Sequence, residues 1–279
     1  ADLAVEPGEI YGLIGPDGAG KSTLMKAVAG VLAYDSGLVT VFGTDVVSER
    51  TAETIKPRIG FMPQGLGLNL YPELSIEENI RFFGRLRLVP GRVLEERKEN
   101  LLAITRLSSF RTRPMKNLSG GMKQKLGLIC SLIHEPDLVI LDEPTTGVDP
   151  VSRRDFWAIL ARLIRERGMS ALVSTAYMDE ASRFHRVSLM HAGKILAEGE
   201  PEEITALVPG IMASISAEPA DRALALLKSR FGQVEAMGGS FRVFLKGQSG
   251  ATARSVLDEV LNGVTCHSLT LAEPDLEDV

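Results

Sequence analysis

A glycine-rich segment that ends in a lysine and a serine could bind the phosphates of a nucleotide. Residues 15–22 fit the pattern G-x-x-x-x-G-K-[ST], follow an apolar run at residues 9–14 and open a helix-like stretch. Backbone N–H groups of such a loop converge on phosphate oxygens, and the helix N-terminus adds positive potential. Lys21 would reach the β- and γ-phosphates, the Ser22 hydroxyl could bind Mg²⁺, and Thr23 could contact the α-phosphate. The alternative is a glycine-rich turn that binds no nucleotide, which the strand, loop and helix context disfavours.

Two adjacent carboxylates follow a second apolar run. Residues 138–141 are typical of a buried strand, and Asp142 and Glu143 come directly after it. Asp142 could hold Mg²⁺ through water, and Glu143 could orient or deprotonate the water that attacks a γ-phosphate. A strand that merely ends in two solvated charges explains this pattern equally well, so the pair gains its meaning from the segments around it.

A second possible anion site precedes another helix-like stretch. Ser119, Gly120 and Gly121 come directly before residues 123–133, and a serine hydroxyl with glycine amides at a helix N-terminus can hold an anion. The alternative is an ordinary N-cap.

In combination these segments resemble the ATP-binding cassette of ABC proteins. Residues 118–122 read LSGGM, which nearly reproduces the LSGGQ signature of that family, and the resemblance covers residues 1 to about 207. It implies ATP and Mg²⁺ as ligands, and Gln64 as the glutamine near Mg²⁺ and the transport-coupling contact. It also implies that residues 146–149 form a loop that crosses to a partner cassette.

The resemblance assigns a role to each matching position. The catalytic residues are Glu143, Lys21 and Gln64, and the metal site comprises Ser22, Gln64 and Asp142. The nucleotide contacts are Gly15, Pro16, Asp17, Gly18, Ala19, Gly20, Lys21, Ser22, Thr23, Ser119, Gly120, Gly121 and Asp149. ATP in such cassettes lies between the phosphate loop of one copy and the signature of another, so a second cassette, identical or fused, is an expected partner.

Three further segments narrow the resemblance to the ATPase subunits of ABC-2-type exporters, which include drug-resistance exporters. They are residues 70–79, 177–181 and 274–279. The wording of the motifs is most similar to bacterial proteins that fuse two cassettes, among them multidrug exporters and a ribosome-associated ATPase. For an exporter, the resemblance implies a transmembrane permease as partner and a peripheral location on the cytoplasmic face of the inner membrane.

Three positions depart from the family pattern. Ala176 stands where cassettes carry a switch histidine, so hydrolysis could be slowed, or this cassette could be the weaker member of a pair. Met122 replaces the last signature residue and leaves the anion-binding serine and glycines intact. Asp17 stands where asparagine is common, and its charge must point away from the phosphates or weaken their binding. The four histidines lie elsewhere and are interpreted as structural or surface residues.

The apolar runs predict the elements that position these residues. Residues 38–42, 59–62, 138–141, 171–174 and 187–190 are mostly continuous hydrophobic runs, which favour a parallel sheet covered by helices. Residues from about 70 to 117 have helical periodicity and predict a helical subdomain. The fold class is therefore α/β, and the resemblance implies a P-loop NTPase core of the RecA-like type over residues 1–209. Residues 210–279 predict a small α+β domain with the βαββαβ order of a ferredoxin-like module.

Composition excludes several classes of protein. The 279 residues are 44% hydrophobic and 24% charged with a net charge of −5, which excludes wholesale disorder and argues against nucleic-acid binding through bulk charge. The arginines of the helical segment are interpreted as a solvated face with acidic neighbours, so no direct nucleic-acid partner is expected unless the protein acts on the ribosome. Two distant cysteines fit a reducing compartment. No run approaches the length needed to cross a bilayer, no signal peptide is evident, and the start on Ala1 suggests a fragment.

The sequence thus predicts an ATP-hydrolysing cassette of an ABC-2-type exporter, with multidrug efflux as the expected process. Two alternatives stay open: a soluble or ribosome-associated ATPase that acts in translation, and a degenerate cassette that senses ATP with little hydrolysis.

Overall fold

Continuous apolar runs form the centre of a six-stranded sheet with the order β4-β5-β6-β1-β7-β8. Its strands are β1 (Ile10–Ile14), β4 (Ile59–Met62), β5 (Leu138–Asp142), β6 (Ser170–Thr175), β7 (Arg186–His191) and β8 (Lys194–Gly199). Strands β1 and β5 are buried along their whole length, as expected for strands that are covered on both faces. The predicted parallel sheet is confirmed, and β8 adds an antiparallel edge strand that the sequence analysis does not anticipate.

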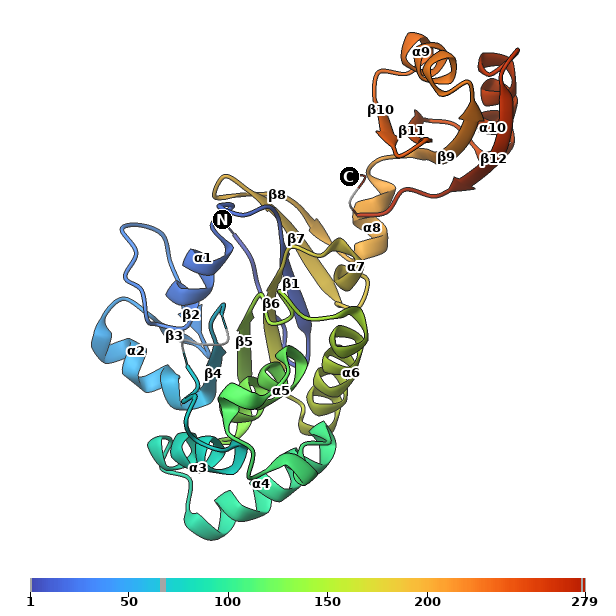
Figure 1. Ribbon diagram of the computed structural model, residues 1–279. Coiled ribbons are helices and arrows are strands. Elements are labelled where there is room, and N and C mark those ends of the chain that lie inside the picture. The colour runs from blue at the N-terminus through green and yellow to red at the C-terminus, as the bar shows by residue number, and fades with distance from the viewer. Residues whose placement is uncertain (1, 66–68, 277, 279) are drawn as a thin grey trace. The chain divides into compact units, whose positions relative to one another are not determined.

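Helices cover this sheet and hold its core (Figure 1). They are α1 (Lys21–Val28), α2 (Glu49–Ile55), α5 (Gly120–Leu132), α6 (Pro150–Arg167) and α7 (Met178–Ala181), with a 3₁₀ turn, η1, at Lys56–Arg58. In one core cluster, Met25 of α1 and Ile55 of α2 pack with Leu13, Ile140 and Leu172 of three adjacent strands. Because the carboxyl ends of parallel strands meet at one edge, β1, β5 and β6 deliver their following residues to the same place.

The prediction of a sheet strand over residues 38–42 is wrong. The chain instead forms a separate antiparallel hairpin of β2 (Thr40–Val41) and β3 (Thr44–Asp45). Phe42 and Gly43 both have positive φ, 52° and 76°, which is the backbone of a two-residue hairpin turn. The reversal at Phe42 therefore ends the run before it can join the main sheet.

The helical segment contains α3 (Ile76–Leu86) and α4 (Gly91–Thr105), followed by the 3₁₀ turns η2 (Ser108–Phe110) and η3 (Met115–Asn117). Figure 1 shows both helices together at one end of the unit that holds the large sheet. Helix α3 begins with a capping box, in which the Ser75 hydroxyl accepts from the Glu78 N–H and the Glu78 carboxylate accepts from the Ser75 N–H. The helical periodicity of this segment is therefore matched by helices, and its standing as a separate subdomain stays a prediction.

The structure describes residues 2–65, 69–276 and 278, and the chain divides into two units, Ala1–Gly199 and Glu200–Val279. The sequence analysis places the boundary after residue 209. The difference is α8 (Pro201–Ala206), which belongs to the second unit.

The second unit has the predicted element order. It consists of β9 (Gly210–Glu218), α9 (Ala220–Arg230), β10 (Val234–Met237), β11 (Ser240–Lys246), α10 (Gly250–Val260) and β12 (Thr265–Ala272). The strands form an antiparallel sheet in the order β10-β11-β9-β12, and the helices bury Leu227 and Leu257 in a core with strand residues. In the family-like closing segment, residues 277 and 279 lie outside the described residues.

Both cysteines are free thiols. Cys130 is buried in α5, and this burial raises the pKa of its thiol far above the usual range, whereas Cys266 is exposed. Tyr11 is a core residue: it is fully buried on β1, its hydroxyl is hydrogen-bonded to Ser188, and burial raises its pKa to about 12. Within the described ranges, no helix combines the length and the apolar character that crossing a membrane requires.

Candidate functional site

Lys21 lies at the centre of the glycine-rich loop between β1 and α1. Its side chain is only 4% exposed, and its Nζ donates to the carbonyl oxygens of Gly15 at 2.7 Å and Pro16 at 3.1 Å. As the first residue of α1, Lys21 also stands at the positive end of the helix dipole. The loop therefore surrounds a cation at the point where phosphate groups are expected.

The rest of the loop faces solvent to different degrees. Pro16, Asp17, Gly18 and Thr23 are exposed, and Ala19 is buried. Across residues 2–65, 69–276 and 278, no hydrogen bond or ion pair engages the Asp17 carboxylate. Nothing in the fold therefore draws this charge toward the interior of the loop.

The Asp142 carboxylate at the end of β5 is held by two serine hydroxyls. Ser22 Oγ donates to Asp142 Oδ1 at 3.0 Å, and Ser174 Oγ donates to the same oxygen at 2.7 Å. The Ser174 hydroxyl also accepts from the Glu143 N–H at 2.9 Å. This contact follows from strand register, because Asp142 and Ser174 are direct partners in the β5–β6 pair.

Glu143 receives three contacts at its carboxylate. Gln64 Nε2 donates to Oε2 at 2.7 Å, Thr146 Oγ1 donates to the same oxygen at 3.2 Å, and Lys21 Nζ lies 3.6 Å from Oε1. The residue is buried and has φ of 48°, a left-handed backbone that is costly for a glutamate and is often found at functional sites. The structure thus brings together the predicted catalytic residues Lys21, Gln64 and Glu143.

The charges at this site are out of balance. Asp142 and Glu143 are two buried carboxylates, and Lys21 is the buried cation beside them. In the described part of the chain, no lysine or arginine forms an ion pair with Asp142. A divalent cation fits here, because Mg²⁺ prefers the hydroxyl and carboxylate oxygens that Ser22 and Asp142 present.

The signature residues begin helix α5. Ser119 is its N-cap and accepts from the Met122 N–H at 3.3 Å, while Ser119 and Gly120 are exposed. A Cβ on Gly121 would lie 2.6 Å from Ser152 Oγ, so only glycine allows α5 to approach the start of α6 this closely. No hydrogen bond or ion pair in the described regions joins these three residues to Lys21 or Glu143.

Asp149 is the N-cap of helix α6. Its Oδ1 accepts from the N–H groups of Val151 at 3.1 Å and Ser152 at 2.9 Å, and the hydrogen bonds from Ser152 hold the pKa of this carboxyl below its usual range. These hydrogen bonds are those of an ordinary helix cap, so the role of Asp149 as a nucleotide contact stays a prediction.

Ala176 is exposed and directly follows β6, the strand that carries Ser174. Its methyl group can neither donate nor accept a hydrogen bond, and none of the four histidines occupies this position. His134 and His185 hydrogen-bond to backbone groups of Ile59 and Ile10, and His191 and His267 are exposed.

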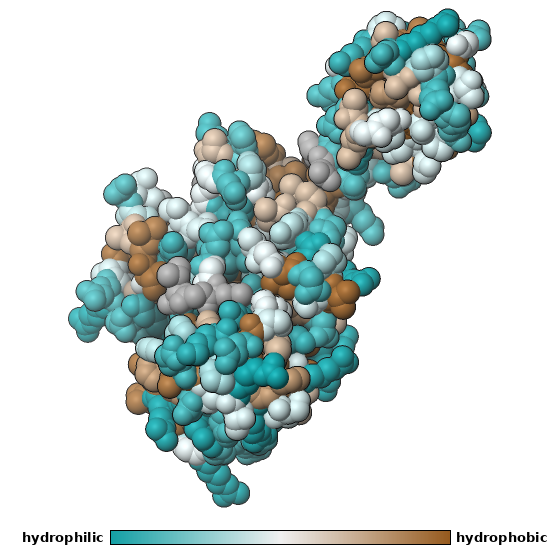
Figure 2. Space-filling model, viewed as in Figure 1, coloured by the Kyte–Doolittle hydropathy of each residue, from teal (hydrophilic) through white to brown (hydrophobic). Residues whose placement is uncertain are grey.

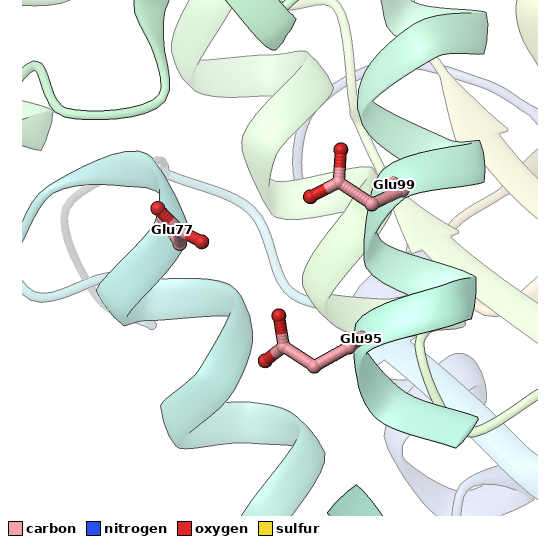
Figure 3. Close-up of side chains that lie close together, drawn as sticks. All are labelled: Glu77, Glu95 and Glu99. Carbon is pink, nitrogen blue, oxygen red and sulfur yellow. The ribbon is translucent and has the colours of Figure 1, made fainter. Parts of the chain in front are cut away.

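Three carboxylates face one another between α3 and α4 (Figure 3). Glu77, Glu95 and Glu99 could in principle hold a metal ion, but Lys98 is buried among them and forms ion pairs with all three. Arg81 binds Glu77 and Glu95, and its hydrogen bond lowers the pKa of Glu95 to about 2. This cluster is therefore an ion-pair network that joins the two helices.

Sequence reasoning does not single out Ser174, and it places Thr146 and Glu180 in family-like segments without assigning either a contact near the paired carboxylates. All three belong to the hydrogen-bond network there. Ser174 contacts Asp142 across 32 residues of sequence, so its role depends on which strands are neighbours. Strand adjacency is the signal that a single sequence lacks.

Comparison with known proteins finds relatives that are named as ATP-binding proteins. Residues 1–146 match the family model "ABC transporter". The chain is 44% identical over 209 residues to the "Probable multidrug ABC transporter ATP-binding protein YbhF" of Escherichia coli (strain K12), covering 75% of this chain and 35% of that protein. It is 38% identical to the "Nod factor export ATP-binding protein I" of Cupriavidus metallidurans, covering 73% of this chain and 66% of that protein. It is also 38% identical to the "Daunorubicin resistance ATP-binding protein DrrA3" of Streptomyces coeruleorubidus, covering 75% and 65%. The chain thus spans between a third and two thirds of the length of these relatives.

Solved structures share the fold of the larger part of the chain. The cbiO1 protein from Clostridium perfringens, described as part of the ABC transporter complex cbiONQ, matches with a TM-score of 0.68 and 26% identity over 73% of this chain and 82% of that one. A structure described as an ATP binding subunit of an ABC transporter matches with a TM-score of 0.64 and 29% identity over 74% and 84%.

Replacing Ser174 by alanine should destabilise the site. The change removes a donor to Asp142 and leaves the buried Glu143 N–H without its acceptor, so we expect the free energy of unfolding to fall by about 1–3 kcal/mol. Urea unfolding followed by the fluorescence of Trp157, the single tryptophan, measures this change in the larger unit. Ser182→Ala removes an exposed hydroxyl in the same unit and should change the value by less than about 0.5 kcal/mol. Equal stability of the two variants would contradict the role given to Ser174.

Proposed function

Because the chain belongs to the ABC transporter family, we propose that it is the ATP-binding and ATP-hydrolysing part of an ABC-2-type exporter. The observation that carries the proposal is that the Glu143 carboxylate contacts both the Gln64 amide and the Lys21 ammonium beside the glycine-rich loop. The relatives at 38–44% identity are named for multidrug transport, Nod factor export and daunorubicin resistance, and these names support export as the direction of transport.

Lys21 and the loop amides bind the phosphates in this proposal. The Lys21 ammonium is already desolvated and points at the carbonyl groups of Gly15 and Pro16. Phosphate oxygens would replace these carbonyls and bind a preoriented cation, which reduces the cost of ordering it. The contacts expected from Gly15 to Thr23 follow from the same arrangement.

Glu143 acts as the general base. Its carboxylate would orient the attacking water and accept its proton, while Gln64 and Thr146 hold the carboxylate in place. The 3.6 Å separation from Lys21 keeps Glu143 close to the phosphate end of the loop.

Mg²⁺ would be held by Ser22 and Asp142 with Gln64 at its edge, and when bound it neutralises charge on the phosphates. Ser174 then serves to orient the Asp142 carboxylate, because it donates to the oxygen that also faces Ser22.

A second cassette completes the site in this proposal. Ser119, Gly120 and the buried Gly121 form no bond with the Lys21 group of their own chain within the described residues. Ser119 and Gly120 are exposed, which leaves this end of α5 open to ATP held by a partner. ATP would draw two cassettes together and hydrolysis would release them, with Asp149 near the junction.

The α3 region is the proposed dock for a transmembrane permease. Tyr71, Phe82, Leu86 and Leu88 are exposed there, and Tyr71 and Phe82 stack edge to face at 4.5 Å. Figure 2 shows apolar patches among hydrophilic surface over this end of the unit. Exposed apolar clusters of this kind mark interaction sites. The cassette would then lie on the cytoplasmic face of the inner membrane, and a multidrug substrate would be selected by the permease.

Glu143→Gln should abolish turnover and preserve ATP binding. The amide cannot accept a proton, so kcat for ATP should fall by about 100-fold or more, whereas Lys21 and the loop are unchanged. Phosphate release and the binding of a fluorescent ATP analogue measure the two effects. Glu202→Gln, on the exposed surface of α8, is the matched control and should behave as wild type. Wild-type protein that binds ATP but shows no turnover above Glu143→Gln would favour the ATP-sensing alternative.

Ala176→His should raise turnover. An imidazole at the exposed end of β6 could donate to the γ-phosphate, and we expect kcat to rise by about tenfold. The same phosphate assay measures it, with Ala220→His in α9 as a control for adding a histidine to the unit that does not hold the site. No increase over wild type would show that the missing histidine does not limit hydrolysis.

Cell fractionation should place the intact protein with membranes. If it couples to a permease, the protein floats with membranes in a density gradient, resists high salt and is released by detergent. Quantitative immunoblotting of each fraction, with a ribosomal protein and a membrane protein as markers, measures the distribution. Pelleting with ribosomes after detergent would overturn export and favour the translation alternative.

A further inference from the structure

Glu180 is a buried carboxylate that the proposed ATP chemistry does not use. It is the third residue of α7 and is 2% exposed. Its Oε1 accepts from Thr145 Oγ1 and its Oε2 accepts from Thr175 Oγ1, each at 2.7 Å. Arg153 Nη1 lies 3.8 Å from Oε1. One carboxylate therefore joins α7 to three other segments of the chain.

The first segment is the turn that carries the proposed general base. Thr145 comes two residues after Glu143, and the next residue, Thr146, donates to the Glu143 carboxylate at 3.2 Å. The Thr145 side chain is almost fully buried, so its hydroxyl depends on Glu180 for an acceptor. The bond to Glu180 thereby fixes the turn that aims Glu143.

The second segment is the end of β6. Thr175 lies between Ser174, which holds Asp142 and the Glu143 N–H, and Ala176. The Thr175 hydroxyl donates to Glu180 and accepts from the Tyr177 N–H at 3.0 Å. These two bonds fix the direction in which the chain leaves the strand.

The third segment is the first turn of α6, which Asp149 caps. Arg153 lies in this turn with its guanidinium 4.3 Å from the centre of the Tyr177 ring and within ion-pair distance of Glu180. The start of α6 is therefore tied to the same carboxylate as the two strand ends.

A carboxylate suits this position better than an amide. Both threonine hydroxyls donate, and an ionised carboxylate accepts at both oxygens. An amide would place an NH₂ group against one hydroxyl and would lose the attraction to Arg153. A buried charge is costly unless it is paired or hydrogen-bonded. Any movement that breaks the contacts of the Glu180 carboxylate is therefore opposed.

We propose that Glu180 is a positioning residue for ATP hydrolysis, which sets the Glu143 turn against the end of β6 and the start of α6. The inference rests on the proposed function. It predicts that weakening the Glu180 contacts misplaces the general base and leaves the glycine-rich loop, and hence ATP binding, intact.

The test compares Glu180→Gln, Thr145→Val and Thr145→Ser in the intact protein with Mg²⁺ and ATP. Glu180→Gln and Thr145→Val should lower kcat by about tenfold or more, the effect of a misplaced catalytic group, with KM and the affinity for a fluorescent ATP analogue within about twofold of wild type. Thr145→Ser keeps the hydroxyl and should restore most of the turnover that valine loses. Glu202→Gln, on the exposed surface of α8, makes the same Glu-to-Gln change outside these contacts and is the matched control, which should keep the wild-type kcat.

A merely structural role gives a different result. The activity of each variant would then fall only in proportion to the fraction of molecules that are folded, which Trp157 fluorescence measures. The folded molecules would keep the wild-type kcat, and this result would overturn the proposal. If Glu180→Gln does not fold, Thr145→Val decides the question: a wild-type kcat in the folded Thr145→Val variant would also overturn the proposal. In both cases wild-type turnover would leave the proposed ATPase function standing. Absence of turnover in wild type would remove that function, and the positioning role with it.

Discussion

The site depends on burying two carboxylates and one ammonium group at the same edge of a sheet. Asp142, Glu143 and Lys21 are all nearly inaccessible to water, and buried charges are tolerated only when they are paired or hydrogen-bonded. Serine and threonine hydroxyls, the Gln64 amide and loop carbonyls supply those bonds. The strand order β5-β6-β1 makes these bonds possible, because it brings the ends of the three strands next to one another.

Much of this arrangement can be predicted from the sequence. The residues that contact one another within a motif, such as Lys21 with its loop, are close in sequence, so their spacing alone indicates their chemistry. The central strands are equally evident, because runs buried on both faces have no polar interruptions. The second unit is predictable for a similar reason, since its apolar positions alternate or recur with clear periods.

The features that sequence reasoning misses depend on distant partners or on local backbone. Ser174 and Glu180 look like ordinary strand and helix residues until β6 is placed beside β5, when their oxygens meet Asp142 and Thr145. Residues 38–42 have strand composition, but a left-handed Phe42 reverses the chain, and no apolar period reveals such a conformation. Strand neighbours and single dihedral angles are properties of the tertiary structure.

The start of α6 links the proposed partner-facing residues to the proposed base. Asp149 caps this helix, Gly121 of α5 packs directly on Ser152, and Arg153 reaches Glu180. The Gly121 contact leaves no free space between α5 and α6. A shift of α5 toward α6 must therefore move the first turn of α6 or separate the two helices. Because Glu180 bonds that turn and the Glu143 segment together, a partner that presses on the signature would also act on the position of the base.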